Sequence, residues 1–232
     1  WLAGRAKPRH SRAMPTPART ALIDHRPWLL ASIVASLGYF LLSDQLPGLF
    51  VMALKGAGVG LLAIYAARRS SGIDGALIAS VLAVAALADI VLEISFLIGA
   101  GLFALSHLVA IALYWRNRRA SLRASQKQAA IAILLLVPAI AALLAWPQAN
   151  WHLATLYAAT LAMMSASAWI SRFPRYRVGV GTLLFVASDL IIIASEAGRF
   201  DPTAAEWMVW PLYYVGQLMI ATGVVQALRN EA

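Results

Sequence analysis

Long apolar segments follow one another along the chain and are separated by short polar connections. Each is close to the roughly 20 residues that an α-helix needs to cross the hydrocarbon core of a bilayer. The pattern therefore predicts an all-α polytopic membrane protein, a bundle of eight transmembrane helices that forms a single domain over residues 28–228. The expected segments are 28–43, 47–67, 75–92, 95–115, 128–146, 150–171, 178–197 and 207–228.

The composition agrees with this pattern. Charged residues make up 12% of the 232 residues and hydrophobic residues 61%, whereas a soluble domain has about 25% charged residues. The chain is too short to hold a separate soluble domain beside the bundle. It has no cysteine, which excludes disulfides and thiolate metal sites.

Positive charge is confined almost entirely to one set of connections. All of the 19 lysines and arginines except Lys55 and Arg199 precede the first segment or follow segments two, four, six and eight. Because basic loops stay in the cytoplasm, we expect both termini to be cytoplasmic, as an even number of spans requires. The formal charge of +9 therefore indicates membrane topology and not nucleic-acid binding. The expected location is a bacterial inner (plasma) membrane.

Residues 1–27 differ from the rest of the chain. They are rich in arginine and proline and contain no apolar run of the kind that a signal peptide carries. We expect them to form a basic, solvated and partly disordered N-terminal tail. Binding of this tail to anionic lipid is the alternative interpretation.

The prolines help to place the ends of the helices. Pro47, Pro147 and Pro211 are expected at or just inside helix starts, where a missing N–H costs little. Pro138 falls inside the fifth segment and is expected to kink it. The connections on the outer side are short, apart from an expected loop over residues 198–206.

Several segments carry polar side chains at depths where only lipid or packed helices are expected. At about 1.5 Å per residue, these side chains lie roughly 6 to 18 Å below the outer ends of the segments. Charged groups at such depths are rare and indicate a functional site. A band confined to the outer half favours a cavity that opens outward or sideways to lipid over a continuous channel. The band comprises Lys55, Asp89, His107, Asp189, Tyr213, Tyr214 and Gln217, with Glu93 at its outer edge.

Local spacing predicts that these residues face other helices. Asp89 and Glu93 are four residues apart and share a helix face, as do Gly99, Phe103 and His107. Two pairs of glycines, Gly56 with Gly60 and Gly179 with Gly181, predict close helix contacts beside Lys55 and Asp189.

A structural interpretation is open for most of these residues. Lys55 could form a buried ion pair with one aspartate, and His107 could be a satisfied core histidine. Glu93 could be a solvated helix end, whereas Tyr213, Tyr214 and Gln217 could cross-bond helices. The two aspartates are harder to explain in this way, because one lysine can fully neutralise only one carboxylate and the other must then be protonated or otherwise satisfied. A protonated aspartate beside an ionised one suits acid/base hydrolysis.

At these residues the sequence resembles the YhhN family of lysoplasmalogenase-like multi-pass membrane proteins. The resemblance covers roughly residues 45–228. The family commonly has proline where Gly56 stands, glycine where Ala88 stands and tyrosine where Ala110 stands, which bears on fine substrate preference more than on the reaction. The matching stretches are Leu54-Lys55, Ala79-Ser80 through Ala88-Asp89, Phe96-x-x-Gly99-x-x-x-Phe103-x-x-x-His107, Gly179-x-Gly181-x-x-x-Phe185-x-x-Ser188-Asp189 and Tyr213-x-x-Gly216-Gln217.

The resemblance implies an enzyme that cleaves the vinyl ether bond of lysoplasmalogens to a fatty aldehyde and a glycerophospho-base. That reaction needs an acid that protonates carbon, a negative charge that stabilises the resulting cation, and a base for water. Asp89 and Asp189 are expected to divide these tasks, with Lys55 as the third catalytic residue. The expected substrate-binding residues are His107, Tyr213, Tyr214, Gln217, Glu93 and Ser188.

No cofactor or metal is expected, and the partners are a lysophospholipid substrate and membrane lipid, with a homodimer left open. Three other interpretations stay open: a transporter or binder of a lipid or small solute, a hydrolase of another ether or ester lysolipid, and a structural bundle whose ion pairs only fix the register of the helices.

Overall fold

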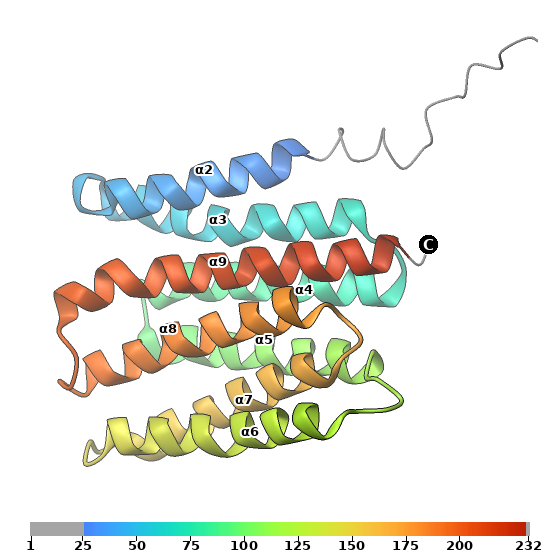
Figure 1. Ribbon diagram of the computed structural model, residues 1–232. Coiled ribbons are helices and arrows are strands. Elements are labelled where there is room, and N and C mark those ends of the chain that lie inside the picture. The colour runs from blue at the N-terminus through green and yellow to red at the C-terminus, as the bar shows by residue number, and fades with distance from the viewer. Residues whose placement is uncertain (1–25, 231–232) are drawn as a thin grey trace, which may run out of the picture.

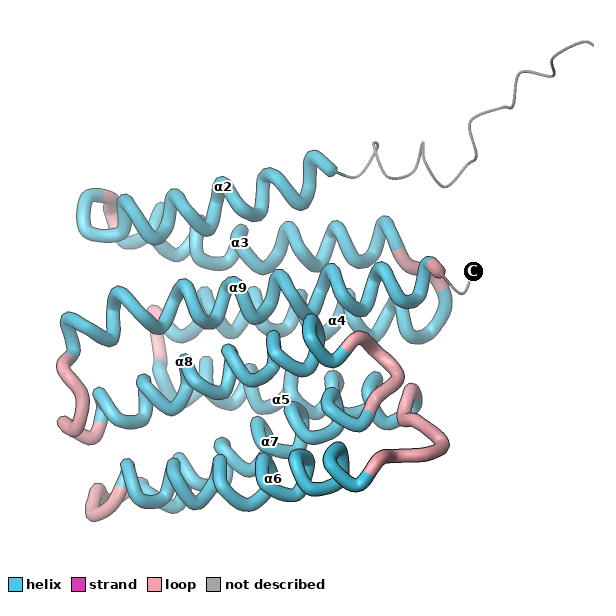
Figure 2. The backbone as a smooth tube through the Cα atoms, viewed as in Figure 1, coloured by secondary structure: helices cyan, strands magenta, loops and turns pink. Residues whose placement is uncertain are grey.

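The computed structural model describes residues 26–230, which fold as a bundle of helices (Figure 1). Short connections join the helices (Figure 2), and an isolated antiparallel bridge between Arg118 and Ser171 is the only strand-like pairing in the described part of the chain. The prediction for the N-terminal tail falls outside the described residues, apart from its last two. The helices are α2 (Arg26–Leu42), α3 (Gly48–Arg69), α4 (Gly72–Leu92), α5 (Phe96–Arg116), α6 (Ala124–Ala145), α7 (Trp151–Ile170), α8 (Val180–Glu196) and α9 (Pro202–Arg229), with a 3-10 turn η1 (Ser43–Gln45) and a π-helical turn η2 (Arg175–Gly179).

Eight helices in residues 26–230 are long and apolar enough to cross a membrane, which confirms the predicted fold class. Consecutive helices run in opposite directions, so the connections alternate between the two ends of the bundle (Figure 1). The arginine-rich connections after α3, α5 and α7 lie at the same end as the last residues of α9, and we call this the basic end. The other end carries Asp44, Glu196, Asp201 and Glu206, and we call it the acidic end. That the basic end faces the cytoplasm stays a prediction.

The last helix begins earlier than expected. A loop was expected over residues 198–206, but α9 starts at Pro202. Asp201 caps this start by accepting a hydrogen bond of 3.0 Å from the Ala204 amide, and proline suits the first turn because no N–H donor is needed there. Pro211 therefore lies inside the helix, and its predicted place at a helix start is wrong.

Glycines bring neighbouring helices into close contact. A Cβ added at Gly216 of α9 would lie 2.7 Å from the carbonyl oxygen of Gly181 in α8, and one added at Gly181 would lie 2.8 Å from that of Gly216. In the same way, a Cβ at Gly56 of α3 would lie 2.5 Å from the Ile90 side chain of α4. Close contact was predicted at Gly56 and Gly181, and both predictions are confirmed.

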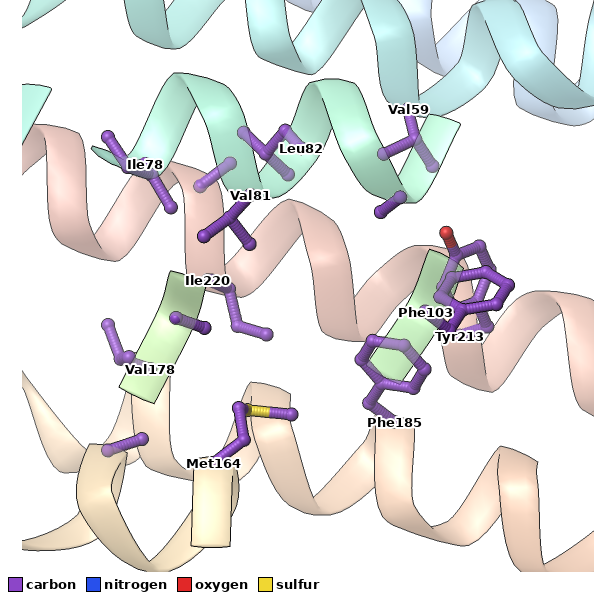
Figure 3. Close-up of a cluster of buried hydrophobic side chains, with 14 of the residues drawn as sticks. Val59, Ile78, Val81, Leu82, Phe103, Met164, Val178, Phe185, Tyr213 and Ile220 are labelled. Atoms are coloured by element: carbon purple, nitrogen blue, oxygen red, sulfur yellow. The ribbon is translucent and has the colours of Figure 1, made fainter. Parts of the chain in front are cut away.

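The buried core has two parts along the length of the bundle. Aliphatic side chains such as Ile78 and Val178 lie apart from an aromatic group of Phe103, Phe185 and Tyr213 (Figure 3). Their positions along the helices place the aliphatic side chains toward the basic end and the aromatic group nearer the acidic end. Large apolar side chains also cover the outer surface of the bundle, where they suit contact with lipid tails. The polar band therefore lies next to the aromatic part of the core.

Candidate active site

Two aspartates from different helices are buried in the half of the bundle nearer the acidic end. Asp89 belongs to α4 and is 2% exposed, and Asp189 belongs to α8 and is 6% exposed. Tyr213, which binds Asp89, packs against Phe185 of α8, one turn before Asp189. The structure therefore places both carboxyl groups around the same part of the core.

Each aspartate accepts a hydrogen bond from a tyrosine on another helix. Tyr213 of α9 donates to Asp89 Oδ2 over 2.8 Å, and Tyr157 of α7 donates to Asp189 Oδ2 over 2.5 Å. Ser188 adds a longer contact of 3.2 Å to the other carboxyl oxygen of Asp189. These donors offset part of the cost of burying a carboxyl group, and they fix its orientation.

Lys55 forms its ion pair with Glu93 and not with an aspartate. Its Nζ donates to Glu93 Oε1 over 2.5 Å and lies 5.5 Å from the centre of the Tyr39 ring. A lysine side chain inside a membrane span extends toward the nearest polar boundary, and Glu93 follows the last residue of α4 at that boundary. Lys55 and Asp89 make no direct ion pair in the described structure.

An apolar cavity of about 630 Å³ lies beside Asp189. Side chains of α5, α7 and α8 form most of its wall, and Leu92 of α4 completes it. Leu97 and Leu156 belong to this wall and are 70% and 65% exposed, so the cavity reaches the lipid-facing surface of the bundle. The polar side chains on the wall are Asn150, Tyr157, Thr160 and Asp189.

Asp89 lies behind this wall rather than on it. Its tyrosine partner, Tyr213, packs against Phe103 and Phe185, with ring centroids 5.6 and 5.0 Å away (Figure 3). Phe103 also lines the cavity. The aromatic group thus connects the cavity wall to the tyrosine that holds Asp89. The two aspartates therefore have different access to a molecule in the cavity.

Two further predicted residues carry buried polar atoms that no described residue satisfies. These atoms are His107 Nε2 and Gln217 Oε1. The His107 ring packs against Tyr157 and Phe185, and its Nδ1 lies 3.5 Å from the hydroxyl of Thr160 on the cavity wall. Buried polar atoms normally have a partner, so these two mark places where water or a substrate group can bind.

Tyr214 lies apart from the other site residues. Its hydroxyl is 2.7 Å from Ser32 Oγ of α2, and Ser32 donates to the Gly58 carbonyl of α3 over 2.5 Å. Its ring stacks on Trp210, one turn earlier in α9. Tyr214 therefore joins three helices, which agrees with the cross-bonding interpretation and places it outside the aspartate pair and the cavity wall.

The sequence analysis missed Tyr157 and Thr160. Both lie on α7, which contributes no predicted site residue, and Tyr157 makes the shortest hydrogen bond to either aspartate. The signal was present in the sequence, because Tyr157 is seven residues into the sixth predicted segment. At about 1.5 Å per residue it belongs to the same polar band as the residues that were found.

The site offers proton donors and acceptors rather than a metal-binding set. Within residues 26–230, no three His, Asp or Glu side chains are grouped so that they could hold a metal ion. The carboxyl groups bind tyrosine hydroxyls instead. Such an arrangement can move a proton to or from a molecule in the cavity.

The fold and the site define an integral, multi-pass membrane protein with a buried acidic site beside a lipid-facing cavity. The model of the YhhN family matches residues 50–224, and the chain belongs to this family. The matched range contains every predicted site residue, from Lys55 to Gln217. No curated protein matches the chain, and no solved structure matches it.

Proposed function

We propose that the protein hydrolyses the vinyl ether bond of lysoplasmalogens, giving a fatty aldehyde and glycerophosphoethanolamine or glycerophosphocholine. Membership of the YhhN family is consistent with a lysoplasmalogenase-like membrane protein. The observation that carries the proposal is the position of the Asp189 carboxyl group on the wall of an apolar cavity that reaches the lipid-facing surface. An acid in such a place can contact the polar end of a chain that lies in the cavity.

The cavity suits an amphiphile with a single tail. Its volume of about 630 Å³ lies within the usual range of small-molecule sites, roughly 300 to 1,000 Å³. The wall is apolar apart from a few side chains gathered near Asp189 and at Asn150, just before the start of α7. A tail can therefore enter from the bilayer between α5 and α7, while the vinyl ether next to the glycerol lies beside Asp189.

In the first step, protonated Asp189 gives its proton to the vinyl carbon that is not bonded to oxygen. The double bond supplies the electron pair for the new C–H bond, and the adjacent carbon and ether oxygen become an oxocarbenium ion. Proton transfer to carbon is slow, so a positioned acid in a water-poor site accelerates it. The hydrogen bond from Tyr157 fixes the Asp189 carboxyl group for this transfer.

In the second step, water attacks the oxocarbenium carbon. We assign Asp89 as the carboxylate that stabilises the cation and accepts a proton from the water, because Asp189 serves as the acid and the hydrogen bond that Tyr213 donates to Asp89 favours an ionised carboxyl group. The resulting hemiacetal breaks down when Asp89 returns this proton to the glycerol oxygen and Asp189 takes the proton of the hemiacetal hydroxyl. Both carboxyl groups are then restored, and one water molecule has been consumed.

The remaining predicted residues have supporting roles in this proposal. His107, whose Nε2 has no partner among the described residues, is a candidate for holding the water. The ion pair of Lys55 with Glu93 lies toward the acidic end, where the charged head group of the lipid would sit. A phosphate would meet Lys55, and the amine of an ethanolamine group would meet Glu93.

Release of aldehyde from a lysoplasmalogen by the purified protein tests the proposal. We expect wild-type protein to release fatty aldehyde from lysoplasmenylethanolamine, and the Asp189→Asn variant to release it far more slowly. The matched control substrate is the saturated alkyl ether lysolipid, which has no carbon that an acid can protonate and should stay intact. Absence of aldehyde above the level of the Asp189→Asn variant would overturn the proposal.

Two further measurements separate the other interpretations. Release of fatty acid from an acyl lysolipid, without aldehyde from the vinyl ether, would indicate a hydrolase of another lysolipid. Movement of unaltered lysolipid across proteoliposomes, with no turnover, would indicate a transporter. We expect neither result, because Asp189 lies on the cavity wall, where our proposal needs an acid, and the lining residues of the cavity include none from the basic half of the bundle.

A further inference from the structure

Two basic loops at the basic end are joined into one rigid unit. The loop between α5 and α6 pairs with the loop between α7 and α8 through the backbone hydrogen bonds from Arg119 to Ile170 and from Arg172 to Asn117. The Arg119 side chain adds a hydrogen bond of 2.7 Å from Nε to the Ser171 carbonyl oxygen. These bonds hold the guanidinium group of Arg119 in a fixed orientation.

A hollow of about 550 Å³ lies between these loops. Three arginines from three places in the chain converge on it: Arg119 from the first loop, Arg123 just before α6, and Arg175 at the start of η2. The rest of the lining is Ala120, Ser121, Leu122 and Gln126. No described residue on this wall is acidic.

The arginines of the hollow repel one another. Burial lowers the pKa of Arg119, and the neighbouring charges of Arg175 and Arg123 lower it further. Asp74 is the one acidic residue that the described structure places at this end, and it is bound to Arg116 at 3.0 Å. The three charges are therefore gathered around open space without a described carboxylate to balance them, and a bound anion would relieve the repulsion.

The hollow lies at the level where lipid head groups are expected. Trp115, at the end of α5, and Tyr176, next to Arg175, are 55% and 84% exposed. Exposed tryptophan and tyrosine side chains are typical of the boundary between the hydrocarbon core and water. The Arg118 guanidinium stacks on the Trp115 ring at 5.4 Å, which fixes a further positive charge at the same level.

We propose that this hollow binds the phosphate of an anionic phospholipid head group from the adjacent leaflet. Arginine matches phosphate oxygens with paired N–H donors, and three arginines around one hollow can surround a phosphate on several sides. A lipid is favoured over free phosphate because the hollow lies at the interface and because Leu122 gives its wall an apolar side chain. Basic pockets between transmembrane helices are suited to such head groups.

Binding of short-chain phosphatidylglycerol to the purified protein in a neutral detergent tests the proposal. The test variant is Arg123→Gln with Arg175→Gln, which spares Arg119 and its structural hydrogen bonds. The matched control is Arg68→Gln with Lys127→Gln, because both residues are exposed at the same end and the loss of charge is the same. We expect saturable binding to the wild-type protein, at least about tenfold weaker binding to the test variant, and less than about twofold change in the control.

Three results would contradict the proposal. Equal weakening in both double variants would mean that diffuse charge, and not the hollow, attracts the lipid. Equally tight binding of short-chain phosphatidylcholine would show that the anionic head group is not recognised. Binding of inorganic phosphate as tightly as phosphatidylglycerol would make the ligand a soluble anion. Far-ultraviolet circular dichroism of each variant shows that the helices are intact, so that a loss of binding reports on the hollow.

Discussion

The contact between α8 and α9 and the contact between α5 and α7 both contain glycine, but the glycines have opposite effects. At the first, Gly181 and Gly216 allow the two backbones to meet, and no space is left for a side chain. At the second, an added Cβ at Gly101 would meet nothing within 4 Å, and Gly101 lines the cavity beside Asp189. Glycine therefore closes one side of the site and keeps the other open to lipid.

The close contact on one side of α8 and the cavity on the other explain how α8 can expose Asp189 to a molecule that enters from the bilayer. The close contact with α9 fixes α8, on which Asp189 lies eight residues after Gly181. Because α9 also carries Tyr213, the same contact sets the distance between the Asp89 and Asp189 sides of the site. The open side then only has to admit a tail.

The largest effect is expected from Gly216→Val in the close contact. Its Cβ would lie 2.7 Å from the Gly181 carbonyl oxygen, and the helices would have to separate. We expect a loss of about 3 kcal/mol or more in the free energy of unfolding, together with loss of all activity. Gly101→Ala is the control, and it should keep or raise stability because alanine favours a helix over glycine by roughly 0.5 to 1 kcal/mol. Thermal unfolding in detergent measures both.

Asp189→Asn should have the next largest effect, and it should act on chemistry alone. Asparagine keeps the shape and the hydrogen bond from Tyr157 but cannot supply the proton. We expect the rate of aldehyde release to fall by about 10² to 10⁴, with an unchanged melting temperature. Asp44→Asn, at the exposed η1 turn, should leave the rate unchanged. An equal loss in both variants would show that the effect is not specific to the cavity.

Much of this organisation can be predicted from the sequence, because it depends on segment length and on rare charges. Eight apolar segments define the helices, and the depths of Asp89 and Asp189 along them predict that the two meet. Close helix contacts follow from the spacing of glycines such as Gly181, since only glycine allows backbones to touch. These features are local, and a count along the chain is enough to find them.

Other features depend on the directions in which side chains point, and counting residues along a segment does not give these directions. Lys55 lies nearer in depth to Asp189 than to Glu93, yet its flexible side chain reaches Glu93. The cavity is a gap between α5 and α7, and a gap has no pattern of its own in the sequence. The depth of Tyr157 along its segment places it in the polar band, but it is uncharged and was therefore not selected as a site residue. The start of α9 was misplaced because Asp201 and Pro202 resemble a loop and in fact begin a helix.

A large side chain at Gly101 would fill the cavity beside Asp189 and so test its role. Gly101→Phe should place a ring in the cavity, because Gly101 lines it and nothing lies within 4 Å of an added Cβ. We expect kcat/KM for a long-tailed lysoplasmalogen to fall by roughly 30-fold, and that for a short-tailed one to change much less. Rates measured over a series of tail lengths, with Gly101→Ala as the control, check this. A loss that is independent of tail length would contradict the assignment of the cavity to the tail.

The smallest effect is expected from removal of one hydroxyl group. Tyr157→Phe deletes the hydrogen bond of 2.5 Å to Asp189, which should cost about 1.5 kcal/mol, or roughly tenfold in rate. Tyr214→Phe is the matched control, since its hydroxyl binds Ser32 and lies apart from the aspartate pair. It should lower stability slightly and leave the rate of aldehyde release per folded molecule unchanged. Similar rates for the two variants would remove Tyr157 from the mechanism.

The central claim is that an acid on the cavity wall protonates the vinyl carbon before water attacks. Hydrolysis of a lysoplasmalogen in D₂O, followed by mass spectrometry of the fatty aldehyde, tests this most directly. Protonation of carbon predicts one deuterium on the carbon next to the aldehyde group in the product of the wild-type protein. Aldehyde without this deuterium, formed at the wild-type rate, would contradict the account.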